Sequence, residues 1–256
     1  MEAMRRDLLS RVKQIGANFK TMLGALARRV LSPFGLELRR IEPPQTSYIG
    51  TQKTLHDANA AGLSLYDYVD QLWNEKGLVE SNIDRFAKSG AFDAKGGNVV
   101  EIGPGTGRYL RHILERMSPA RYDIYETAND WRAWLKETYP FITVCETDGR
   151  SLSQTEKANL VTSFGVFTYL PIVVALGYFR EMIRVATPNS HVIFDLFSER
   201  SLADADAWLA AKRYESSFLS TGYVTDLFAR ENFSLVDSFL SKYGPGVSEF
   251  LVFKRK

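Results

Sequence analysis

The fold of this chain is decided by one stretch, VVEIGPGTGRYL, which occupies residues 99–110. It reads as a buried strand, a turn with Gly103, Gly105 and Gly107, and the start of a helix. Glycine has no Cβ and adopts positive φ easily, so such a turn can bring bare backbone against a ligand. The N-terminus of the following helix presents unpaired N–H groups to polar or anionic ligand atoms. The stretch therefore predicts a nucleotide-like pocket where the strand meets the helix.

The spacing of the glycines indicates which class of nucleotide the pocket would bind. The dinucleotide fingerprint is G-x-G-x-x-G, but here the third glycine comes one residue early and is followed by Arg108. No Lys-Ser or Lys-Thr pair follows the glycines, which excludes a P-loop. Glu101 precedes them, and Glu-x-Gly-x-Gly-x-Gly after an apolar strand closely resembles the first motif of class I S-adenosylmethionine-dependent methyltransferases. The resemblance implies that Glu101 and the three glycines bind S-adenosylmethionine; the alternative is a structural turn in another α/β protein.

Two further acids follow at the spacing of strand–helix units. Residues 122–126 read as a second strand that ends in Glu126, whose two oxygens can accept hydrogen bonds from both ribose hydroxyls. Residues 141–145 read as a third strand, and Asp148-Gly149 lies in the loop after it. The resemblance implies that this pair contacts the adenine amino group. An ordinary Asp-Gly turn is the alternative.

The fourth strand, residues 158–165, supplies the next wall of the expected pocket. The small side chain of Ser163 leaves room for a ligand at the carboxyl end of the sheet, where ligands of open α/β sheets bind. Phe164 is expected to wall the adenine, with plain core packing as the alternative. The resemblance places Tyr169 on the substrate side.

The rest of the chain completes an α/β pattern. Helices are expected at residues 108–117, 171–185, 201–212 and 225–231, and further strands at 191–197, 234–240 and 249–253. Strands that alternate with helices indicate a mainly parallel sheet covered on both faces. The expected fold is Rossmann-like, with a seven-stranded mainly parallel sheet, an antiparallel edge strand and an N-terminal helical extension.

We expect three parts along the chain: a basic amphipathic helical segment at residues 1–41, a helical lid or cap region at 42–94, and a class I methyltransferase domain at 95–256. Within the cap region Ser81 is expected to be the N-cap of a helix at 81–88. Tyr48 is a candidate for lining the substrate side of the lid, and simple packing is the alternative.

Residues 1–41 carry a net charge of +6, which leaves −4 for the rest of a chain whose total is +2. Apolar residues recur there at helical spacing. A basic amphipathic helix can lie on an anionic membrane surface, or it can pack on a partner subunit or on its own chain. A nucleic-acid partner is disfavoured because aromatic residues are sparse in this segment and the rest of the chain is slightly acidic.

The cysteine and histidine content argues against a disulfide-bonded or metal-binding protein. One cysteine, Cys145, cannot form an intramolecular disulfide and indicates a reducing compartment, so we expect a cytoplasmic protein, with residues 1–41 attaching it at the inner membrane face as a hypothesis. Three histidines and one cysteine show no metal-ligand spacing, so no metal is expected. No apolar run approaches the roughly 18 residues of a transmembrane helix.

The acceptor rests on a weaker resemblance. Residues 65–73 and 243–253 resemble bacterial sugar O-methyltransferases of cell-surface polysaccharide pathways. The resemblance implies in-line methyl transfer to a sugar hydroxyl of a glycan or a similar small hydroxylated acceptor. Asp195, at the end of the fifth strand, is expected to face the acceptor, but the sequence names no catalytic base. The alternatives are a lipid, small-molecule or protein acceptor, or a catalytically idle binding or scaffold protein.

Overall fold

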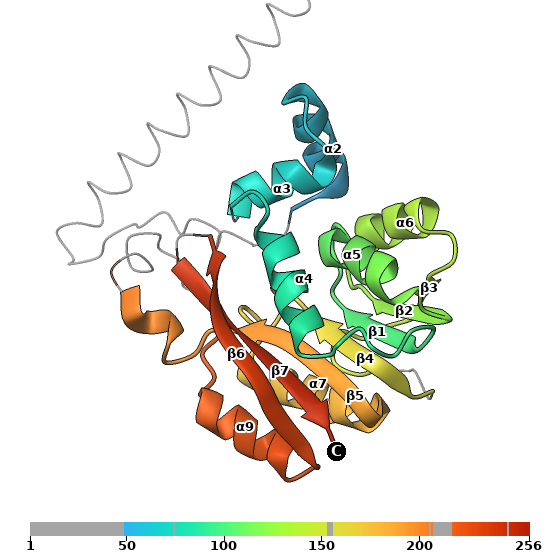
Figure 1. Ribbon diagram of the computed structural model, residues 1–256. Helices are drawn as coiled ribbons and strands as arrows, with labels where there is room; N and C mark the ends of the chain where they lie inside the picture. Colours follow the sequence, from blue (N-terminus) through green and yellow to red (C-terminus); the bar gives the residue numbers. More distant parts are fainter. Residues whose placement is uncertain (1–48, 74, 153–155, 205, 207–216, 245) are drawn as a thin grey trace, which may run out of the picture. The chain divides into compact units, whose positions relative to one another are not determined.

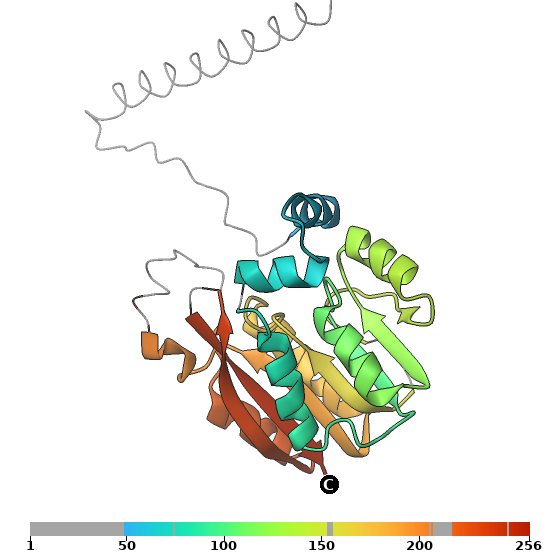
Figure 2. The same cartoon turned by 45° about the horizontal axis from the view of Figure 1, so that its top comes forward.

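The computed structural model describes residues 49–256 except 74, 153–155, 205, 207–216 and 245 (Figures 1 and 2). The segment 1–41, Tyr48 and most of the helix expected at 201–212 lie outside the described residues. The described residues belong to one compact unit, Thr46–Lys256.

A seven-stranded sheet organises this unit, in the order β3-β2-β1-β4-β5-β7-β6. Strands β1 to β5 pair in parallel, and β7 runs antiparallel to both β5 and β6. The Rossmann-like fold with an antiparallel pair at one edge is therefore confirmed. The strands are β1 (Asn98–Ile102), β2 (Arg121–Tyr125), β3 (Thr143–Val144), β4 (Ala158–Ser163), β5 (Ala186–Leu196), β6 (Phe233–Tyr243) and β7 (Gly246–Arg255).

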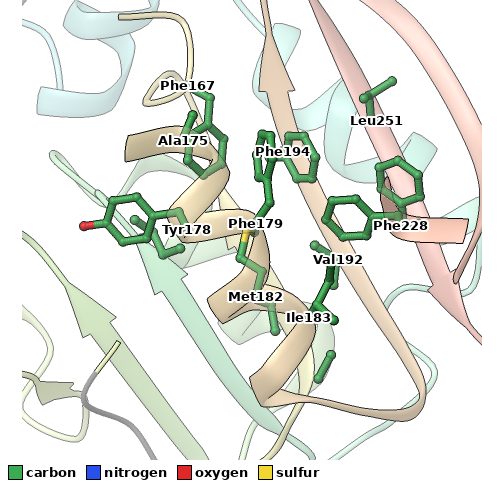
Figure 3. Packing of buried hydrophobic residues seen from close by; sticks show 14 of the residues in the cluster. Phe167, Ala175, Tyr178, Phe179, Met182, Ile183, Val192, Phe194, Phe228 and Leu251 are labelled. Carbon is green, nitrogen blue, oxygen red and sulfur yellow. The ribbon is translucent and has the colours of Figure 1, made fainter. Parts of the chain in front are cut away.

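Helices cover the sheet on both faces (Figure 1). Successive strand residues point to opposite faces, so Val99 joins the cluster beneath α4 and α5, whereas Val100 joins the cluster beneath α7 and α9. Figure 3 shows the second cluster, where Phe179 of α7 stacks on Phe194 of β5 with 4.8 Å between ring centroids. The helices are α2 (Thr51–Ala60), α3 (Leu65–Trp73), α4 (Leu78–Lys88), α5 (Arg108–Met117), α6 (Asn129–Thr138), α7 (Ile172–Val185) and α9 (Thr221–Ala229), with a short 3-10 turn, η2 (Ser201–Asp204).

Several predicted boundaries are wrong. Helix α4 begins at Leu78 behind Gly77, which has φ +81°, so Ser81 lies inside the first turn and is not the N-cap. The third strand is only two residues long, because just Thr143 and Val144 pair with β2, and Phe141 is exposed. Strand β5 begins five residues early and includes Pro188, which the irregular register between β4 and β5 tolerates.

Candidate functional site

The loop between β1 and α5 crosses the carboxyl end of the sheet. Its three glycines share a positive φ, but their surroundings differ. All have positive φ, namely +63° at Gly103, +52° at Gly105 and +72° at Gly107. A Cβ at Gly103 would lie 2.5 Å from Val166 Cγ2, so that backbone packs directly on the neighbouring loop. A Cβ at Gly105 would meet no described atom within 4 Å, which leaves this backbone facing open space. Gly107 is the left-handed N-cap of α5.

Glu126 ties this loop to the next strand. It follows β2, and its Oε2 accepts a hydrogen bond from Gly105 N at 3.0 Å while its Oε1 accepts one from Ala128 N at 2.9 Å. The side chain is buried, and burial raises the pKa of its carboxyl. Each carboxylate oxygen has two lone pairs, so both oxygens retain the capacity to accept from a ligand.

Glu101 lies beneath the loop rather than in the cavity. It is 1 % exposed and accepts a hydrogen bond from Tyr122 Oη at 2.6 Å. Burial raises the pKa of this carboxyl to about 8, although the bond from Tyr122 opposes the shift. Glu101 is not among the residues that line the cavity, and its carboxyl is enclosed against Tyr122 of β2. The cofactor contact expected of Glu101 therefore stays a prediction.

A cavity of about 320 Å³ opens above the loop, within the size range of small-molecule sites. The glycine loop and Glu126 form one side of it. Residues of the cap, of α6 and the segment before it, of the loop after β4 and of the β6–β7 hairpin form the rest. Its lining residues are Ile49, Val69, Gly103, Pro104, Gly105, Thr106, Arg108, Glu126, Thr127, Ala128, Trp131, Phe164, Gly165, Val166, Tyr169 and Tyr243.

The loop after β4 is held by stacking and by a buried acid. The ring of Phe164 stacks on Tyr109 with centroids 4.0 Å apart. Gly165 N donates to Asp195 Oδ1 at 2.6 Å, and Asp195 is 1 % exposed and does not line the cavity. Ser163 Oγ donates to Ile102 O, also out of the cavity. Of the residues predicted for this region, Phe164 and Tyr169 line the cavity, whereas Ser163 and Asp195 lie behind it.

Asp148 and Gly149 do not line the cavity themselves. Asp148 Oδ1 accepts from Arg150 N, Ser151 N and Ser151 Oγ, and these bonds hold the pKa of the carboxyl below its usual range. A Cβ at Gly149 would lie 3.4 Å from Cγ2 of Thr127, which does line the cavity. The adenine contact expected of this pair therefore stays a prediction.

The cap reaches the site, before α2 and from α3, through contacts that sequence reasoning missed. Trp131 Nε1 donates to Ile49 O at 2.7 Å, and Arg108 Nη1 donates to Asp70 Oδ1 at 3.1 Å. Tyr243, from the end of β6, also lines the cavity. The positions of Trp131, Asp70 and Tyr243 follow from long-range packing, and the one local signal was Arg108, directly after the motif.

The described residues restrict the chemistry of the site. None of those lining the cavity is a histidine or a lysine, and Glu126 is the one carboxylate among them. Within the described part of the chain no three His, Cys, Asp or Glu residues gather as metal ligands would. No described helix is both long and apolar enough to cross a membrane.

Comparison with known proteins agrees with this geometry. The chain resembles the N-methyltransferase NodS from Bradyrhizobium japonicum WM9, solved with S-adenosyl-L-homocysteine, at 13% identity and TM-score 0.54, over 69% of this chain and 86% of that one. It also resembles magnesium protoporphyrin IX methyltransferase from Synechocystis PCC 6803 with bound SAH, at 13% identity and TM-score 0.57, over 82% and 96%. An O-methyltransferase family protein from Burkholderia thailandensis matches at 15% identity and TM-score 0.53, over 80% and 62%. At these identities the likeness shows the fold.

The sheet order, the glycine loop and the acid after β2 define a Rossmann-like methyltransferase. The sequence matches the family described as Methyltransferase domain over residues 73–238, and the chain belongs to this family. It is therefore a methyl-transferring enzyme with S-adenosylmethionine as its cofactor. No curated protein sequence matches the chain.

Proposed function

We propose that the protein transfers the methyl group of S-adenosylmethionine to a sugar hydroxyl of a cell-surface glycan or its precursor. The observation that carries the methyl-donor site is Glu126, whose two oxygens are held at the cavity wall by Gly105 N and Ala128 N. The sugar acceptor is supported by the two stretches that resemble sugar O-methyltransferases, because each contributes a cavity residue, Val69 and Tyr243.

The residues present fit the cofactor. Open space above Gly105 admits a ligand close to the backbone, and Glu126 offers acceptor lone pairs to the ribose hydroxyls. Phe164 and Val166 supply an apolar wall for the adenine. When bound, S-adenosylmethionine would supply a sulfonium methyl group: the acceptor oxygen would attack the methyl carbon in line, S-adenosylhomocysteine would be the leaving group, and the hydroxyl proton would pass to solvent.

The chain contributes orientation and exclusion of water. Ile49, Val69 and Trp131 cover the cavity from the cap side. Tyr169 and Tyr243 bring phenol groups to the other side. A phenol has an ordinary pKa of about 10, so the hydroxyl of Tyr169 is protonated at neutral pH and can donate hydrogen bonds. Such groups can orient a sugar hydroxyl without removing its proton. Holding two reactants collinear in a dry site supplies much of the acceleration, and we assign no general base.

Calorimetry on the full chain tests the cofactor site without an acceptor. S-adenosylmethionine and S-adenosylhomocysteine should bind the wild type, and Glu126→Ala should weaken binding by about 1.5–3 kcal/mol, the range of hydrogen bonds to a charged group. NAD should not bind. A folded protein that binds neither S-adenosylmethionine nor S-adenosylhomocysteine would contradict the proposal and favour an idle scaffold.

The acceptor is tested separately by following labelled methyl groups from the donor into methyl glycosides and isolated glycans. A base-stable methyl ether on a sugar supports the proposal. Labelled lipid, small-molecule or protein products in place of a methylated sugar would keep the methyltransferase and overturn the sugar acceptor.

A further inference from the structure

Large apolar side chains are exposed where the chain leaves β4 and enters α7. Tyr169 is 40 % exposed, Ile172 48 % and Val173 76 %. Phe218 is 46 % exposed, and its neighbour Ser217 is bonded to the same stretch, because Ser217 N donates to Thr168 O at 3.0 Å and Ser217 Oγ donates to Leu170 O. We name these four residues the apolar rim: Tyr169, Ile172, Val173 and Phe218.

The fold gives no reason for these side chains to be apolar. Ile172 and Val173 are the first two residues of α7, where acidic and polar side chains stabilise a helix, yet its first turn contains no acid. The sequence between Lys157 and Arg180 contains no charged residue. Exposed apolar groups add nothing to the core, and clusters of them mark binding surfaces.

The apolar rim is continuous with the cavity. Tyr169 belongs to both, since it lines the cavity and is partly exposed. From the cap, Val69 of α3 also lines the cavity, and Leu72, one helical turn further along, is 51 % exposed. Residues three apart share a helix face. Apolar groups from two separate elements therefore extend from the lining of the cavity toward solvent.

We propose that the apolar rim binds a hydrocarbon chain carried by the acceptor, so the acceptor is an amphiphile such as a glycolipid. Its hydroxylated head group enters the cavity beside Tyr169 and Tyr243, and its chain lies on Ile172, Val173 and Phe218. The identity of the head group rests on the proposed function. Because the apolar rim continues directly from the cavity, a chain attached to the bound head group reaches it, and no separate partner is required.

The test uses the full chain with S-adenosylhomocysteine present and a series of methyl, hexyl and octyl β-D-glucosides below their micelle concentrations. Calorimetry should show affinity that rises with chain length, by at most about fourfold per methylene group, the fold-change that corresponds to about 0.8 kcal/mol. Val173→Asp should flatten this dependence, and Phe218→Ser should do the same. Val236→Asp is the matched control, since Val236 is 44 % exposed on β6 and does not line the cavity.

Each outcome separates this inference from the proposed function. Affinity that is independent of chain length, with binding of methyl glucoside intact, overturns the hydrocarbon site and leaves a sugar methyltransferase. A Val236→Asp variant that flattens the series as strongly as Val173→Asp also overturns it. Light scattering that shows Val173→Asp converting a dimer to a monomer would reassign the apolar rim to an interface between copies. Failure of every glucoside to bind, while S-adenosylhomocysteine binds, would count against the sugar head group itself.

Discussion

Glu101 and Glu126 are two buried carboxyls at the ends of neighbouring strands, and their surroundings give them different roles. Glu101 is enclosed and bonds Tyr122, whereas Glu126 accepts from backbone N–H groups and lines the cavity. The charge of Glu126 also raises the pKa of Glu101. At neutral pH Glu101 is therefore mainly protonated and enclosed, whereas Glu126 lines the cavity.

Replacing Glu101 should change how stability depends on pH. The pKa of Glu101 is raised from 4.5 to about 8 in the folded state. Between about pH 5 and pH 8 the native state holds a proton that the unfolded state has lost, so stability falls as pH rises, by up to about 1.4 kcal/mol per unit. Glu101→Gln keeps an oxygen for Tyr122 and should make this decline shallower. Denaturant unfolding at pH 5, 6.5 and 8 measures the free energy of unfolding of both proteins. The same decline with pH in wild type and Glu101→Gln would contradict the raised pKa of Glu101.

Ligand binding should depend on pH through Glu126. Burial raises the pKa of this carboxyl, and its ionised form is the better hydrogen-bond acceptor. Affinity for S-adenosylhomocysteine should therefore fall on acidification, at a pH above the usual carboxyl range of about 4.3. Calorimetry across pH 4.5–8 measures this, with Glu126→Gln binding more weakly and with a flatter profile. An unchanged profile in that variant would show that another group is responsible.

Gly103 should tolerate a side chain poorly. Alanine there must adopt φ near +63° and would bring its Cβ to 2.5 Å from Val166 Cγ2. We expect Gly103→Ala to lower the free energy of unfolding by about 2–5 kcal/mol, from left-handed strain and overpacking together. Adding Val166→Ala should restore the overpacking part.

The matched control for that change is Gly62→Ala. Gly62 has φ +65° and a Cβ there meets no described atom within 4 Å, so this variant should lose only about 1–2 kcal/mol. Thermal or denaturant unfolding compares the three variants. Equal losses for Gly103→Ala and Gly62→Ala would mean that Val166 yields freely.

Among the elements, α2 and α3 depend on a few contacts to the body of the enzyme. Thr51 N donates to Asp130 Oδ2, Trp131 Nε1 donates to Ile49 O, and Arg108 pairs with the largely buried Asp70. Figure 2 shows the two helices above the carboxyl ends of the strands. Since Arg108 also lines the cavity, the pairing joins the position of α3 to the binding site.

Asp70→Asn should loosen α3 without unfolding the sheet. The neutral amide weakens the pairing between residue 70 and Arg108, so amide hydrogen exchange over Leu65–Trp73 should accelerate while β1 and β4 stay protected. Affinity for S-adenosylhomocysteine should fall by a few fold. Asp84→Asn removes the exposed pair with Arg116 between α4 and α5 and serves as the control. Exchange in α3 that is equal in both variants would argue against a link through Arg108.

Residues set by local sequence motifs could be predicted from the sequence, whereas residues placed by long-range contacts could not. The glycine loop and Glu126 are set by short motifs, so their placement at one sheet edge followed from the strand–helix pattern. Trp131, Asp70 and Tyr243 reach the cavity through packing between distant segments, which carries no local signature. Boundaries failed where backbone geometry outweighed pattern, as at Gly77 before α4 and Pro188 within β5.

At the scale of the whole molecule, the positive charge of residues 1–41 makes membrane attachment one of three hypotheses for this segment, beside packing on a partner subunit or on its own chain. Replacing Arg5, Arg6, Arg11 and Lys13 by glutamine in the full chain removes four positive charges. Each such charge near an anionic surface contributes about 1 kcal/mol. Flotation should therefore show wild type, but not the variant, bound to phosphatidylglycerol vesicles at low salt. Equal binding of wild type and variant to these vesicles would exclude electrostatic attachment through residues 1–41. Binding of the wild type to vesicles of pure phosphatidylcholine would exclude it as well.

The sheet order β5-β7-β6 also constrains biosynthesis. Strand β6 is translated before β7, yet it pairs with the sheet only through β7. Until β7 emerges, β5 presents an open strand edge, which invites pairing with other chains. Tyr243 lies at the end of β6 and lines the cavity, and β6 is held in the sheet by β7. The nascent enzyme therefore cannot complete its binding site before β7 is inserted. A ribosome stalled before residue 246 would carry a chain that is both inactive and prone to aggregate.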